Sequence, residues 1–102
     1  MAVYAFVMSM KARDKPFMLA PAPWPDVPSD DPLGESSRQL ALNLRAAIGA
    51  EKLRSVAART SVGHPTLLNI LNGRVWPDFR TVVNLERGLQ VSLWPSGHLP
   101  KA

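Results

Sequence analysis

The sequence contains no cysteine and only two histidines, His64 and His98. The lack of cysteine excludes a disulfide framework, a thiolate metal site and a cysteine nucleophile. The chain also has no Gly-rich phosphate loop, no spaced pair of carboxylates and no cluster of metal ligands. We therefore expect a protein that is not an enzyme and that uses no cofactor and no metal.

Long apolar runs are missing as well, because no stretch approaches the roughly 20 residues that span a bilayer. The apolar first ten residues are followed by Lys11 and Arg13, whereas a secretory signal carries its basic residues first. The sequence therefore predicts a cytoplasmic protein without a membrane partner.

Acidic residues are few in the second part of the chain. Residues 35–102 carry nine Lys or Arg against four Asp or Glu, and residues 1–34 carry three against four. No carboxylate occurs between Glu51 and Asp78. An excess of positive charge of this kind suits a polyanionic partner such as nucleic acid.

Prolines divide the chain near residue 35. Six of the ten lie in residues 11–34, where each removes a backbone donor and favours extended geometry, so we expect no helix there. Residues 1–35 are thus interpreted as an N-terminal arm: a short strand at residues 3–10, then a proline-rich linker. Residues 36–95 form the expected domain, and residues 96–102 a short tail.

Helical signals begin after the arm. Ser36 or Ser37 is the expected N-cap of a first helix that buries Leu40, Leu44 and Ile48 and ends at Gly49. A second helix is expected over residues 53–60, and a tight turn follows in which Gly63 is free to take a positive φ. A third helix covers residues 64–72.

Two further helices complete an all-α fold of five helices. Asp78 is the expected N-cap of the fourth, and residues 91–95 are expected to form a short fifth turn of helix that Pro95 stops. The expected inward side chains of the fourth are Phe79, Val82, Val83, Leu85 and Leu89.

The second and third helices are joined by about three residues. Such a pair meets at a steep angle, which allows the second helix of the pair to enter the DNA major groove. Here that helix buries Leu67, Ile70 and Leu71 and turns a carboxylate-free surface outward. Its N-terminal amides, near Gly63 and His64, favour a phosphate.

The stretch VAARTSVGHPTLLNILNGRVWPDFRTVVNLERGLQVSL resembles the helix-turn-helix domain of lambda-repressor/Cro-type regulators. The resemblance covers about 60 of the 102 residues. The matching steps are Val56-Ala57, Val62, His64 to Thr66, Leu67, Asn72-Gly73, Pro77 and Leu85 to Leu93. The chain departs from the family at Gly63, where Ser or Thr is usual, at Leu53, where Gln is frequent, and at Leu71, where Glu is frequent.

The resemblance implies a five-helix lambda-repressor-like helix-turn-helix bundle with a proline-rich N-terminal arm. It also implies sequence-specific binding of double-stranded DNA by a transcriptional repressor, similar to actinobacterial regulators and phage immunity repressors. Residues expected to contact bases are His64, Pro65, Thr66 and Asn69. Residues expected to contact phosphates are Arg54, Arg59, Asn72, Arg74 and Arg80.

Regulators of this type commonly bind palindromic operators as homodimers. Two surfaces are candidates for the dimer contact, the apolar end at Leu93 and Trp94, and the segment with Tyr4, Phe6 and Met8. Alternatively, residues 11–15 lie along DNA. A second hypothesis is an antitoxin or another regulator that uses residues 1–35 to bind a protein, in which case residues 3–25 order only on that partner.

Overall fold

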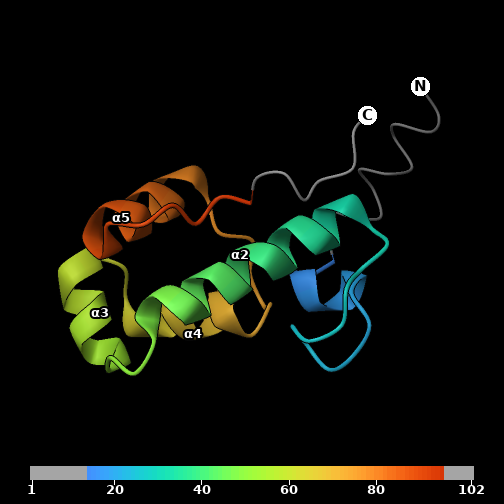
Figure 1. Cartoon of the computed structure of the whole chain (residues 1–102), viewed down its shortest axis with the longest axis horizontal. Helices are drawn as coiled ribbons and strands as arrows, with labels where there is room; N and C mark the ends of the chain where they lie inside the picture. Colours follow the sequence, from blue (N-terminus) through green and yellow to red (C-terminus); the bar gives the residue numbers. More distant parts are fainter. Residues whose placement is uncertain (1–13, 96–102) are drawn as a thin grey trace.

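The computed structural model describes residues 14–95 of the chain (Figure 1). These residues are all-helical: no strand occurs among them, which confirms the expected all-α class for this part. The segment with Tyr4, Phe6 and Met8, its expected strand and the tail at residues 96–102 lie outside the described residues. The elements are a 3-10 helix, η1 (Pro16–Leu19), and four α-helices, α2 (Pro32–Ile48), α3 (Leu53–Thr60), α4 (His64–Leu71) and α5 (Phe79–Leu89).

Helix α2 begins four residues before the earlier of its two expected N-caps. The carboxylate of Asp31 accepts hydrogen bonds from the backbone N–H groups of Leu33 at 2.9 Å and Gly34 at 3.0 Å. Pro32 occupies the first helical position, where its missing N–H costs nothing. The prediction of Ser36 or Ser37 as N-cap was therefore wrong, whereas the predicted end at Gly49 is confirmed.

The turn between α3 and α4 has a different conformation from the expected one. Ser61 adopts the left-handed conformation with φ 62°, and Gly63 has an ordinary φ of −61°. Between them Val62 is buried, and its N–H donates to the hydroxyl of Thr60 at 3.2 Å. The positive φ expected at Gly63 was therefore wrong, because the chain already reverses at the residue that ends α3.

The predicted fifth helix is absent from the described residues. Gln90 ends α5 in the left-handed conformation, and residues 91–95 continue as an irregular segment. The carboxylate of Glu86 accepts from the N–H groups of Leu93 at 2.7 Å and Trp94 at 3.2 Å, and the Leu93 carbonyl accepts from the Asn43 amide at 2.9 Å. These side chains satisfy the backbone groups of Leu93 and Trp94 in the irregular conformation, without a fifth helix.

The core forms where the four α-helices meet. Its buried members are Leu40, Leu44, Ile48, Val56, Val62, Leu67, Ile70, Val82, Leu85 and Leu93. The expected burial of Phe79 was wrong, because its side chain is 80% exposed. Phe79 is the first residue of α5, and helical side chains lean toward the N-terminus, which directs this ring past the core.

The proline-rich segment packs on the helices. The Trp24 indole N–H donates to the Leu71 carbonyl at 2.9 Å, and the Phe17 N–H donates to the Gly73 carbonyl at 2.9 Å. Figure 1 shows η1 lying against the N-terminal part of α2, while α3 lies toward its other end. The prediction that prolines exclude helix from residues 11–34 was wrong at η1 and at the start of α2, where proline stands in a first turn.

Gly34 shows how closely this segment approaches α2. A Cβ at residue 34 would lie 2.6 Å from the Leu19 carbonyl oxygen, so only glycine fits under η1 at this point.

None of the helices in residues 14–95 has the length and apolar character needed to cross a membrane.

Candidate nucleic-acid interface

Helix α4 has one buried face and one open face. Leu67 and Ile70 are buried against the core, while His64, Pro65 and Thr66 are exposed at the start of the helix. Asn69, one turn further on, is half-buried. The helix therefore exposes three of the four residues that the sequence predicted as base contacts and leaves the fourth, Asn69, partly accessible.

The N-terminus of α4 carries no side-chain cap, because Gly63 occupies the N-cap position. The first turn contains Pro65, which has no N–H, so the amides of His64 and Thr66 are those left at this end. A helix N-terminus with uncapped amides attracts an anion through its partial positive charge. This end of α4 has the electrostatic character that a DNA phosphate requires.

The expected phosphate contacts fall into two groups. Arg54, Asn72, Arg74 and Arg80 are exposed, and within residues 14–95 none of the three arginines forms an ion pair. Arg59 differs from them: its guanidinium lies 2.9 Å from the Glu51 carboxylate and donates to the Gly88 carbonyl at 3.0 Å. Arg59 therefore holds α3 to the end of α5.

The fold brings Lys15 next to Arg74. Its ammonium donates to the Arg74 carbonyl at 3.3 Å, although 59 residues separate the two. The proline-rich segment thus adds a cation to the loop that follows α4. No local sequence signal marks this pairing. Exposed Phe79, next to Arg80, was missed as a surface residue because its place in the apolar pattern suggested burial.

The least exposed ion pair of the described residues is structural. Arg38 donates to the two Glu35 oxygens at 2.9 and 2.7 Å and to the Pro25 carbonyl at 3.1 Å. Hydrogen bonding from Arg38 lowers the pKa of Glu35 from 4.5 to about 2. This pair fixes the proline-rich segment to α2 and offers no charge to a ligand.

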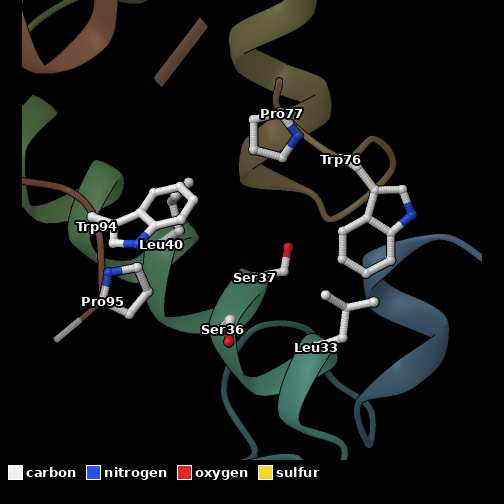
Figure 2. Close-up of a pocket in the computed structure, with 8 residues that line it drawn as sticks. All are labelled: Leu33, Ser36, Ser37, Leu40, Trp76, Pro77, Trp94 and Pro95. Carbon is white, nitrogen blue, oxygen red and sulfur yellow. The ribbon is translucent and has the colours of Figure 1, made fainter. Parts of the chain in front are cut away.

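The two candidate dimer contacts near the C-terminal end of the described chain lie in different environments. Leu93 is fully buried in the core, whereas Trp94 is 59% exposed. Trp94 borders an apolar groove of about 180 Å³, and Figure 2 shows Trp76 on the opposite side of this groove. Sequence reasoning named Trp94 as a candidate dimer contact and did not foresee a groove between the two tryptophans.

Within residues 14–95, no three His, Cys, Asp or Glu side chains gather in a way that could hold a metal ion. Comparisons of the chain with protein-family models, with curated proteins and with solved structures found no match.

Proposed function

We propose that this chain is a sequence-specific double-stranded DNA-binding protein, a transcriptional repressor that uses α3 and α4 as a helix-turn-helix of the lambda-repressor/Cro type. The observation that carries the proposal is the arrangement of α4, which buries Leu67 and Ile70 and exposes His64, Pro65 and Thr66. A recognition helix needs this combination of a packed inner face and a polar, accessible N-terminal half.

The charge distribution supports the same proposal. Residues 52–77 contain four basic residues and no carboxylate, so the segment that includes α3, α4 and the following loop does not repel phosphates. In this proposal Arg54, Asn72, Arg74 and Arg80 bind phosphates and set the position of α4, while Thr66 and Asn69 contact base edges. Arg59 contributes less, because Glu51 already neutralises it.

The proposal includes the binding of two copies of the chain to one palindromic operator, because one α4 contacts only one half-site. Such a repressor acts in the cytoplasm by occluding a promoter. The antitoxin alternative receives less support. The described part of the segment that a toxin would order, residues 14–25, packs on the chain's own helices through Phe17 and Trp24.

The test is selection of duplexes from a random pool, followed by titration of the selected and an unselected duplex at several salt concentrations. We expect the selected duplex to bind at least about 10³-fold more tightly, and both affinities to fall steeply as salt rises. Equal affinity for the two duplexes at every salt concentration would overturn sequence-specific binding.

A further inference from the structure

The groove between Trp76 and Trp94 is an apolar feature of the described surface that the proposed DNA contact does not use. Leu33, Ser36, Ser37 and Leu40 of α2 line it, and Figure 2 shows the two indoles on opposite sides of it. Pro77 and Pro95, which follow the two tryptophans in the sequence, complete the lining. The groove is therefore an apolar slot between two aromatic walls.

Several of its side chains are more exposed than large apolar groups usually are. Trp94 is 59% exposed, Leu33 44% and Trp76 36%. Clustered apolar surface of this kind is unfavourable in water and marks a place where another apolar group binds.

The path of the chain indicates what that group is. The Trp76 indole N–H donates to the carbonyl of Asp14 at 2.8 Å, so the first described residue lies against one wall of the groove. Thirteen residues precede it, and residues 1–10 are uncharged and include Tyr4 and Phe6. Met8 and Asp14 are six positions apart, so the extended chain between them reaches up to about 20 Å, which is ample to bring this segment to the groove.

We propose that residues 3–8 of the same chain occupy the groove and place an aromatic ring, from Tyr4 or Phe6, between Trp76 and Trp94. The size is suitable, because an apolar cavity of about 150 Å³ holds a benzene molecule and this one has about 180 Å³. Aromatic rings pack favourably edge-to-face or offset against indoles.

Attachment to the same chain favours this occupant over a second copy. A short tether gives the segment an effective concentration in the millimolar range. A stable dimer, in contrast, buries at least about 1,200 Å² in total, far more than a slot for one or two side chains provides. This inference does not depend on DNA binding.

The test compares the full chain with a chain that lacks residues 1–10, by NMR of the three indole N–H groups. Single Trp→Phe variants assign the signals. We expect removal of residues 1–10 to shift the signals of Trp76 and Trp94 and to leave Trp24, which bonds to Leu71 and does not line the groove, nearly unchanged. The truncation keeps every described residue, and the circular dichroism spectra of the two proteins are compared to check that both are folded.

The double substitution Tyr4→Ser/Phe6→Ser in the full chain is expected to reproduce the shifts. The matched control Val3→Ser/Val7→Ser removes two apolar side chains of the same segment and is expected to shift them less. Mixed labelled and unlabelled chains then separate the sources of the contact. NOEs from Tyr4 or Phe6 to Trp94 within one chain support the proposal. NOEs between chains, or indole signals that the truncation leaves unchanged, would overturn it.

Discussion

The indole of Trp24 lies directly on Gly73. A Cβ at residue 73 would come within 2.6 Å of Trp24 Cε2, and Gly73 has φ 68°, a conformation that side chains disfavour. The same indole donates to the carbonyl of Leu71, the last residue of α4. The proline-rich segment is thus fastened to the end of the helix that we propose to bind DNA.

The first prediction concerns this contact. Gly73→Ala is expected to lower the free energy of unfolding by about 2–4 kcal/mol, because the methyl group meets the indole and the positive φ is strained. Urea denaturation followed by circular dichroism measures the loss.

Gly49→Ala is the matched control. Gly49 also has a positive φ of 57°, but the nearest atom to its Cβ position is a carbonyl oxygen 3.9 Å away, so only the backbone cost of about 1–2 kcal/mol is expected. In a Trp24→Ala background, Gly73→Ala is expected to cost no more than Gly49→Ala. Equal costs in the unmodified background would show that Trp24 does not press on Gly73.

The second prediction concerns acid stability. Because Arg38 lowers the pKa of Glu35 to about 2, the folded state binds this proton less tightly than the unfolded state. The stability that results is complete above about pH 4.5 and is lost as the pH falls toward 2. Glu35→Gln is expected to cost about 1–3 kcal/mol at pH 7 and to flatten the pH dependence between 4.5 and 2.

Urea denaturation of both proteins at a series of pH values checks this expectation. The two curves should converge as the pH approaches 2, because protonation removes the charge that the substitution removes. Curves that stay parallel over this range would exclude a lowered pKa for Glu35.

The third prediction concerns the segment after α5. Glu86→Gln replaces a carboxylate that accepts from two amides, and a hydrogen bond to a charged group contributes about 1.5–3 kcal/mol. We expect faster hydrogen exchange at the N–H groups of Leu93 and Trp94 and a loss of about 1–2 kcal/mol in stability. The control Glu51→Gln removes an exposed ion pair with Arg59 and is expected to cost under about 1 kcal/mol. Unchanged exchange at residues 93 and 94 would contradict the role of Glu86.

Local patterns in the sequence predict much of the fold. Leu40, Leu44 and Ile48 recur at helical spacing and are buried, and Asp78 caps α5 as its position before Phe79 predicts. The spacing of Leu67 and Ile70 likewise predicts the buried face of α4. It therefore also predicts that the residues of the candidate site lie on the opposite face.

Several of the features that sequence analysis missed depend on contacts between distant residues. The Trp24–Leu71 hydrogen bond joins residues 47 positions apart, and the Asn43–Leu93 bond joins residues 50 apart. The second of these bonds, together with Glu86, replaces the expected fifth helix by an irregular segment. The groove was missed for the same reason, because Trp76 and Trp94 line it from two separate segments.

The fourth prediction separates phosphate binding from general charge. Arg74→Ala is expected to weaken binding to the selected and the unselected duplex alike and to reduce the salt slope by about one unit. Arg87→Ala makes the same change in net charge at a residue of α5 that is not among the proposed phosphate contacts, and it is expected to leave both affinities nearly unchanged. Equal losses for the two variants would place the contact elsewhere.

The most direct test of the central claim, that α4 reads DNA sequence, is the affinity of Asn69→Ala for the selected and the unselected duplex. If the Asn69 amide contacts a base, the substitution weakens binding to the selected duplex by about 1–3 kcal/mol, roughly 5- to 150-fold, and leaves the unselected duplex unaffected. Unchanged affinity for the selected duplex, or an equal loss on both, would contradict the placement of α4 as the recognition helix.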